Sequence, residues 1–250
     1  MTNNNIYFIA NWKMYGNIRD INKVNPVIKL ANTKKYKKYK IIYCPPYTLL
    51  NNFYKKVRNS RISIGAQNCE SNYEYGPFTG SINSKLIKST GAKYIIIGHS
   101  ENRSNGETDF IINKKIRSTL RDNLKVIFCI GETLSEKKRK KTYNVLKKQI
   151  NNGLKNIKKF DNIIIAYEPI WSIGTGMVPK NFELSKNINN IKKILIKIKK
   201  SINIKVLYGG SVNPENIKKL AQIKELNGFL VGGSSLNAKK FIDIIKKSIN

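Results

Sequence analysis

Short apolar runs rich in isoleucine and valine recur along the whole chain, and the segments between them have the pattern of amphipathic helices. The runs are apolar throughout rather than alternating, which is typical of parallel strands covered on both faces. Strand–helix pairs joined by right-handed crossovers close most simply into an α/β fold, a (β/α)8 barrel. The predicted strands are residues 7–10, 41–44, 62–66, 94–97, 126–130, 163–167, 206–208 and 228–231.

Capping residues and apolar spacing locate several helices. Asn237 precedes an amphipathic segment at 238–249, and Asn213 with Pro214 begins another. Residues 184–202 repeat isoleucine and leucine at helical spacing, with lysine on the opposite face. An open doubly wound sheet is the alternative, but no GxGxxG pattern follows the first strand to favour it. No linker or break in composition divides the chain, so residues 1–250 are predicted to form a single domain.

The cellular setting is predicted from segments and residue types that the sequence lacks. No apolar run approaches the roughly 20 residues that span a bilayer, and the start of the chain has no signal-type pattern. We therefore expect a cytoplasmic protein that does not bind membranes. Cys44, Cys69 and Cys129 are few and unpatterned, which indicates buried thiols in a reducing compartment. With one histidine and no CxxC pair, no metal site is expected.

The strongly basic composition raises the possibility of a nucleic-acid partner. The chain has 47 Lys and Arg against 15 Asp and Glu, a formal net charge of +32. However, the lysines are spread over nearly every predicted helix, and lysine far exceeds arginine, the residue that favours base recognition. Weak binding of polyanions is compatible with this distribution. No specific nucleic-acid partner is predicted.

Two polar residues that follow apolar runs are candidates for acid–base catalysis. His99, the one histidine, follows residues 94–97, and Glu168 follows residues 163–167. The C-terminal ends of barrel strands meet at the face where catalysis occurs, and histidine titrates near neutral pH. A helix beginning after His99 would disfavour the protonated imidazole through its dipole. The alternatives are a structural histidine bonded to backbone carbonyls and a salt bridge of Glu168 at the rim.

The segment after Glu168 has the composition of a hinged lid. Pro169 stiffens its start, and Gly174 and Gly176 free its far end. The Ile-Trp-Ser-Ile sequence between them would form an exposed apolar patch that favours aggregation unless it has a function. A carboxylate that such a lid covers becomes a stronger base when water is excluded.

Glycine pairs follow the last two predicted strands, where barrels of this kind commonly bind phosphate through backbone N–H groups. They are Gly209-Gly210 and Gly232-Gly233. Lys13 follows the first strand, where it either holds an anion or is one more surface lysine. Together with the lid and the acid–base pair, these segments indicate an enzyme for a small phosphorylated carbonyl compound.

In this order and at nearly this spacing, the segments resemble those of triosephosphate isomerase. The resemblance covers essentially the whole chain and implies a TIM barrel without metal or organic cofactor. It implies the interconversion of dihydroxyacetone phosphate and D-glyceraldehyde 3-phosphate through an enediolate, a step of glycolysis and gluconeogenesis. The motifs are Asn11-Trp12-Lys13-Met14, Ala66-Gln67-Asn68, residues 76–80, Gly98-His99-Ser100-Glu101, Cys129-Ile130-Gly131-Glu132-Thr133, residues 166–176, Tyr208-Gly209-Gly210-Ser211 and Val231-Gly232-Gly233.

The resemblance also implies the roles of the site residues. Glu168 would move the proton between neighbouring carbons, and neutral His99 would polarise the carbonyl and shuttle protons between the oxygens. Lys13, with Asn11 beside it, would stabilise the enediolate, and Glu101 would support Lys13. Ser100 would help to set the histidine loop. The residues implied in binding the substrate and its phosphate are Asn11, Lys13, Gly174, Ser211, Gly232 and Gly233.

Members of the family are usually homodimers in which the loop after the third strand inserts into the partner. Here that loop runs from Asn72 to Thr79, with Phe78 and Thr79 at its tip. Ser81 and Asn102 stand where the family commonly has a Glu and an Arg that pair at the interface. Because both partners are replaced, no buried charge is orphaned. We therefore still expect a homodimer through this loop.

Other departures from the family pattern leave the reactive groups in place. Tyr15 replaces an Asn, and Ser172 and Ser234 stand where Ala is commoner. A catalytically lapsed basic barrel that binds polyanions is the alternative function. The intact set of Lys13, His99 and Glu168 argues against it.

Overall fold

The computed structural model describes residues 6–72, 74–199 and 204–249. Its strands are all parallel, follow one another in sequence order around a closed barrel, and end where β8 pairs with β1. The (β/α)8 barrel predicted from the sequence is therefore confirmed. The strands are β1 (Tyr7–Asn11), β2 (Lys40–Cys44), β3 (Ser63–Ala66), β4 (Tyr94–Ile97), β5 (Lys125–Ile130), β6 (Ile163–Tyr167), β7 (Lys205–Tyr208) and β8 (Gly228–Val231).

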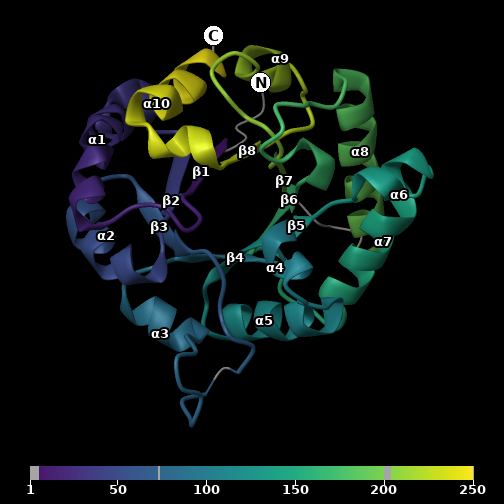
Figure 1. The fold of residues 1–250 in the computed structure, drawn as a ribbon, viewed down its shortest axis with the longest axis horizontal. Helices are drawn as coiled ribbons and strands as arrows, with labels where there is room; N and C mark the ends of the chain where they lie inside the picture. The colour runs from purple at the N-terminus through teal and green to yellow at the C-terminus, as the bar shows by residue number, and fades with distance from the viewer. Residues whose placement is uncertain (1–5, 73, 200–203, 250) are drawn as a thin grey trace.

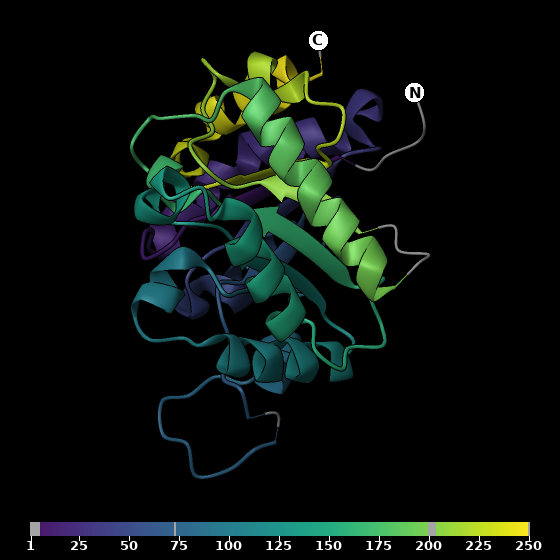
Figure 2. The ribbon, with the colours of Figure 1, turned by 90° about the vertical axis from the view of Figure 1, so that its right-hand side faces the viewer.

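Helices form a ring around the barrel, as Figure 1 shows in a view into its open end. One segment departs from this compact body: the loop between β3 and α3 extends away from it (Figure 2). The α-helices are α1 (Asn25–Asn32), α2 (Leu50–Val57), α3 (Ser84–Ser89), α4 (Ser100–Ser104), α5 (Asp109–Arg121), α6 (Leu134–Lys138), α7 (Thr142–Gly153), α8 (Asn181–Ile198), α9 (Ile217–Ala221) and α10 (Ala238–Lys247). The short 3-10 helices are η1 (Ile18–Val24), η2 (Lys34–Tyr36), η3 (Tyr47–Leu49), η4 (Ile170–Ser172) and η5 (Gly233–Leu236).

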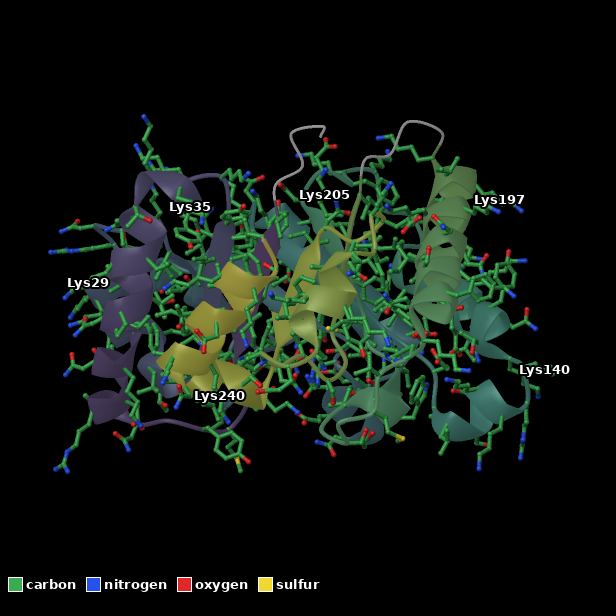
Figure 3. All side chains as sticks on the ribbon, turned by 90° about the horizontal axis from the view of Figure 1, so that it is seen from above. Lys29, Lys35, Lys140, Lys197, Lys205 and Lys240 are labelled. Carbon is green, nitrogen blue, oxygen red and sulfur yellow. The ribbon has the colours of Figure 1, made fainter. Side chains whose placement is uncertain are left out.

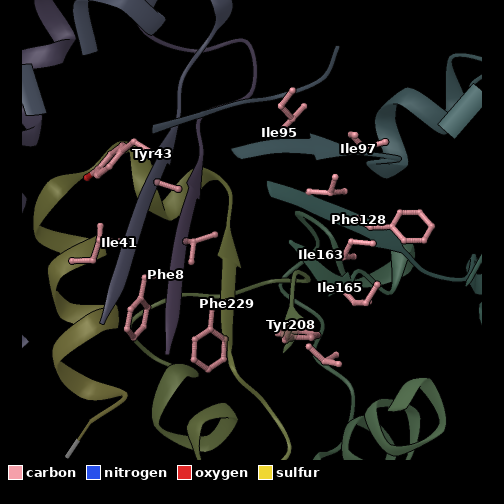
Figure 4. Close-up of a cluster of buried hydrophobic side chains, with 14 of the residues drawn as sticks. Phe8, Ile41, Tyr43, Ile95, Ile97, Phe128, Ile163, Ile165, Tyr208 and Phe229 are labelled. Carbon is pink, nitrogen blue, oxygen red and sulfur yellow. The ribbon is translucent and has the colours of Figure 1, made fainter. Parts of the chain in front are cut away.

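Alternate residues of each strand pack on opposite faces of the barrel wall. Phe8, Ile95 and Phe128 belong to the layer between strands and helices, part of which is drawn in Figure 4. Ile9 and Ile96 belong to a second cluster, which fills the barrel interior. Because both faces are buried, the strands are apolar throughout, which explains the continuous runs in the sequence.

Most predicted element boundaries agree with the structure, with strand ends shifted by about one residue. The helix predicted to begin at Asn213 and Pro214 instead begins at Ile217, because the Asn213 side chain accepts from the N–H groups of Glu215 and Asn216 and holds a turn there. The last helix ends at Lys247 rather than at Ile249.

The prediction for α8 was wrong at its start, because the helix begins at Asn181 rather than at Leu184. Its first three residues contain one apolar side chain, Phe182, which is 81% exposed and does not belong to the buried apolar face that begins at Leu184. The helix ends at Ile198, and Ile202, the predicted end, lies outside the described residues. The Asn237 side chain accepts from the Lys240 N–H and caps α10, as predicted.

Lysine side chains surround the body rather than forming one arm. Figure 3 shows this for Lys29, Lys35, Lys140, Lys197 and Lys240, which come from different elements. Within the described residues, no helix combines the length and apolar character needed to cross a membrane. The three cysteines are all buried and unpaired in the structure, as predicted, whereas the reducing compartment stays a prediction.

Candidate active site

A cavity of about 250 Å³ opens at the C-terminal ends of the strands. Asn11, Lys13, His99 and Glu168, which come from the ends of β1, β4 and β6, all line it. Three segments far apart in the sequence therefore contribute these four residues to one place, as the sequence motifs predicted. The other lining residues are Ile173, Gly174, Gly176, Gly209, Gly210, Ser211, Val212, Asn213, Leu230, Gly232, Gly233 and Ser234.

Strand alternation explains how two of these side chains enter the cavity. Glu168 continues the alternation of Ile164 and Ala166, whose side chains fill the barrel interior. Asn11 continues that of Tyr7 and Ile9 in the same way. Asn11 is therefore the last inward position of β1, and Glu168 is the inward position directly after β6.

His99 does not follow the alternation of its strand. Ile96 points inward, so a regular strand would direct residue 99 toward the helix layer. Gly98 has a φ of +74°, a conformation that favours glycine, and this turns the chain before His99. Arg103 fixes the turn by donating from Nε to the Gly98 carbonyl at 2.8 Å.

Glu168 is only 2% exposed, and burial raises the pKa of its carboxyl group above the ordinary value. His99, the Cys129 thiol and Lys13 oppose this effect of burial only in part. Oε1 lies 3.4 Å from Nε2 of His99, and Oε2 has no hydrogen-bond partner. A buried carboxylate that lines the cavity and has an oxygen without a hydrogen-bond partner is poised to accept a proton from a bound molecule.

The hydrogen bonds of His99 select one neutral tautomer. Its Nδ1 accepts from the Glu101 N–H at 3.2 Å, at the start of α4. A nitrogen that accepts cannot carry a proton, so the ring proton of the neutral imidazole is on Nε2. His99 therefore presents an N–H donor to the cavity, beside Glu168.

Lys13 is held in place by contacts from several loops. Its φ of +53° is unusual for a residue with a side chain and costs about 1 kcal/mol. The backbone is fixed by Asn11 Oδ1, which accepts from Lys13 N at 3.1 Å, and by Gln67 Nε2, which donates to Lys13 O at 2.7 Å. The Lys13 ammonium pairs with Glu101 at 2.5 Å. Glu101 thus contacts the site through Lys13, as the resemblance implied. The hydrogen bond from Gln67 to Lys13 was not predicted.

The glycine-rich loops form the other end of the cavity. Gly233 begins η5 and Gly232 precedes it, and both line the cavity, so the start of a short helix lies at this end. Ser211 also lines the cavity, but its N–H donates to Ser172 O at 3.1 Å. Ser234, the departure noted above, adds a hydroxyl to the lining.

The lid, residues 169–177, begins with η4 and contains Gly174 and Gly176 at φ values of +71° and +76°. Its Trp171 donates from Nε1 to Glu132 Oε1 at 2.9 Å, and Tyr167 OH donates to Glu132 Oε2 at 3.1 Å. Burial raises the pKa of Glu132 despite these hydrogen bonds. Sequence reasoning did not single out Glu132, although it follows a buried strand just as Glu168 does.

The chain matches one protein family over nearly all of its length. Residues 6–248 match the family described as triosephosphate isomerase. Similar curated proteins include the triosephosphate isomerase of Geotalea uraniireducens (strain Rf4), 38% identical over 96% of this chain and 97% of that protein. Another is the triosephosphate isomerase of Buchnera aphidicola subsp. Acyrthosiphon pisum (strain APS), 42% identical over 96% of each chain.

A solved structure has the same fold. The crystal structure of triosephosphate isomerase from Bartonella henselae is similar at a TM-score of 0.89 and 32% identity, over 98% of this chain and 99% of that one. The architecture, the cavity and the whole-length similarity therefore agree, and the chain belongs to the triosephosphate isomerase family.

Proposed function

We propose that this barrel catalyses its isomerisation with Glu168 as the base, His99 as the polarising acid and Lys13 as the electrostatic stabiliser. The reaction is that of the family, the interconversion of dihydroxyacetone phosphate and D-glyceraldehyde 3-phosphate. The observation that carries the assignment is the meeting of these three groups at one cavity of about 250 Å³, a size suited to a triose phosphate.

Proton transfer follows from the geometry of the carboxylate. Glu168 removes a carbon-bound proton next to the substrate carbonyl and returns it to the neighbouring carbon. Because burial raises its pKa, the carboxylate holds the proton between the two steps more readily than an exposed glutamate would.

The charge that develops on the substrate oxygens is met by two fixed donors. His99 donates from Nε2 to the carbonyl oxygen, and the Lys13 ammonium stabilises the negative enediolate. Both groups are held before substrate arrives, His99 by the Glu101 N–H and Lys13 by Asn11 and Glu101. Such preorganisation lowers the barrier because little rearrangement is needed during the reaction.

Backbone groups of the glycine loops are proposed to bind the phosphate. Gly232 and Gly233 would donate at the start of η5, Gly174 would contribute from the lid, and Ser211 would line the site from the loop after β7, where its N–H and Oγ donate to Ser172. Asn11 and Lys13 would contact the substrate between the phosphate and the reacting carbons.

A coupled assay tests the proposed function. Purified protein is supplied with D-glyceraldehyde 3-phosphate, and dihydroxyacetone phosphate is detected by its NADH-dependent reduction. We expect rapid turnover by the unaltered chain and a loss of at least about 10³-fold in the variant Glu168→Gln, which keeps the shape but removes the base. Turnover indistinguishable from buffer in the unaltered chain would refute the proposal.

We also propose a homodimer formed through the loop 72–79. Tyr73 of this loop lies outside the described residues. The extended loop carries Tyr75 and Phe78, which are 68% and 46% exposed, and Met14 in the loop after β1 is 95% exposed. Large apolar side chains in such positions favour burial by a partner. A mass measurement by light scattering at micromolar concentration should give two chains, and a single-chain mass would contradict the proposal.

We further propose how the chain is organised and where in the cell it acts. We propose that residues 1–250 act as one catalytic domain, because the family match spans residues 6–248. A cytoplasmic location is proposed because the substrates are intermediates of central carbon metabolism. Fractionation of the source cell would test it.

A further inference from the structure

Ser172 is a buried polar residue at the junction of the lid and the loop after β7. It ends η4, and its side chain is 0% exposed. Burying a hydroxyl is unfavourable unless its hydrogen bonds are replaced, so its partners show what it connects.

Three segments meet at the Ser172 hydroxyl. Its Oγ lies 2.6 Å from the Met177 carbonyl at the far end of the lid, and 2.8 Å from the Tyr208 hydroxyl at the end of β7. The Ser211 N–H also donates to this Oγ, at 3.3 Å. The Ser172 Oγ atom thus connects the first part of the lid to its far end and to the neighbouring loop.

The direction of each hydrogen bond follows from the donors available. The Met177 carbonyl can only accept, so the single Ser172 proton is donated to it. Ser172 Oγ then accepts from Tyr208 and from Ser211. Burial raises the pKa of Tyr208 to about 12, so this phenol keeps its proton and can donate. The hydrogen-bonding capacity of the serine hydroxyl is fully used.

The loop after β7 leaves room for this arrangement through Gly210. A Cβ at this position would lie 2.3 Å from Tyr208 OH and 2.5 Å from Ser172 Oγ. Any side chain at Gly210 would therefore displace the pair of hydroxyls. Because Ser211 also donates from its own Oγ to Ser172 O at 2.6 Å, the contact is reinforced in the backbone.

We propose that Ser172 is a positioning residue for the reaction: its hydroxyl latches both ends of the lid to the loop after β7. The proposal rests on the proposed isomerase function. A latched lid keeps the enediolate enclosed until the proton is returned. When the lid opens early, the intermediate has a competing route. The carbon–oxygen bond to phosphate breaks, phosphate leaves with the electron pair, and the remaining enol becomes methylglyoxal. This balances without any further reactant.

The first test measures the latch without using activity. Hydrogen–deuterium exchange of the lid amides is compared between the unaltered protein and the variant Ser172→Ala. The loss of one net hydrogen bond predicts exchange about five- to tenfold faster in the lid. Ser84→Ala is the matched control, because Ser84 is equally buried and its hydroxyl bonds to Ser118 and Asp122, far from the lid along the chain.

The second test measures the chemical consequence. In Ser172→Ala the ratio of methylglyoxal to isomerised product should rise about five- to tenfold, whereas it should stay unchanged in Ser84→Ala. Tyr208→Phe removes one partner from the opposite side and should shift exchange and product ratio in the same direction. The double variant Ser172→Ala/Tyr208→Phe should change both less than the sum of the single effects.

The possible outcomes separate the latch from the function. Lid exchange and product ratio equal to those of the unaltered protein, in both Ser172→Ala and Tyr208→Phe, would overturn the latch. Faster lid exchange in a protein that shows no isomerisation at all would support the latch as a contact and overturn the proposed function instead. If Ser172→Ala does not fold, Tyr208→Phe decides between these outcomes.

Discussion

Shortening Glu168 by one methylene is the sharpest test of the geometry at the site. In Glu168→Asp the carboxylate would be retracted by about 1.5 Å, the length of one carbon–carbon bond. In the present structure Oε1 lies 3.4 Å from His99 Nε2, so base and acid face the same small volume. A misplacement of about 1 Å can cost about 10²-fold in rate. We therefore expect kcat to fall by about 10²- to 10³-fold, which corresponds to about 2.7–4 kcal/mol of barrier.

The split between kcat and KM distinguishes this explanation from general damage. The proposed phosphate contacts lie at Gly232 and Gly233, away from Glu168, so KM should change by less than about threefold. Glu225→Asp is the matched control, because Glu225 precedes β8 at the opposite end of the barrel and contacts Asn189. A coupled assay gives both constants. A Glu168→Asp enzyme with kcat within threefold of the unaltered chain would refute the reasoning.

Three further results are expected from charge and burial. Carbon-13 NMR of labelled glutamate should give a midpoint above 4.5 for Glu168, assigned by its loss in Glu168→Gln, because burial raises its pKa; a midpoint at or below 4.5 would contradict this. Burial also raises the pKa of Glu132, so the folded state binds more protons than the unfolded state and stability falls as pH rises above 4.5. The variant Glu132→Gln lacks this titrating group, so the decrease in the free energy of unfolding that it causes, measured by urea unfolding, should be smaller at pH 8 than at pH 4. The difference should be about 1.4 kcal/mol for each unit by which the pKa of Glu132 is raised. Equal decreases at the two pH values would contradict a raised pKa of Glu132. Finally, a net charge of +32 should speed capture of the anionic substrate, so kcat/KM should decrease from 20 to about 200 mM salt, and a flat profile would be inconsistent with steering.

The barrel could be predicted from the sequence because its signal is local. Each strand is buried on both faces, so its residues are apolar one after another, as in Ile163–Tyr167. His99 and Glu168 were recognisable because a polar residue ends such a run. The first turn of α8 was missed because Asn181 and Glu183 are polar and Phe182 points to solvent, so the apolar period begins only at Leu184.

The contacts that adjust the site were not predictable in the same way. Ser172 and Tyr208 are 36 residues apart, Glu132 and Trp171 are 39 apart, and Gln67 reaches Lys13 across 54 residues. The motifs contain these residues, but nothing in the local sequence around each one identifies its partner. Only the closed barrel brings them together, because it places the ends of all the strands at one rim.

Isotope incorporation during turnover tests most directly whether Glu168 transfers a proton beneath the lid. Dihydroxyacetone phosphate is converted in D₂O, and proton NMR follows the carbon-bound position next to the new carbonyl. A carboxyl group that receives the proton and exchanges it with solvent should place deuterium at this carbon, and Glu168→Gln should abolish both turnover and incorporation. Rapid isomerisation that persists in Glu168→Gln, with or without deuterium at this carbon, would contradict the account.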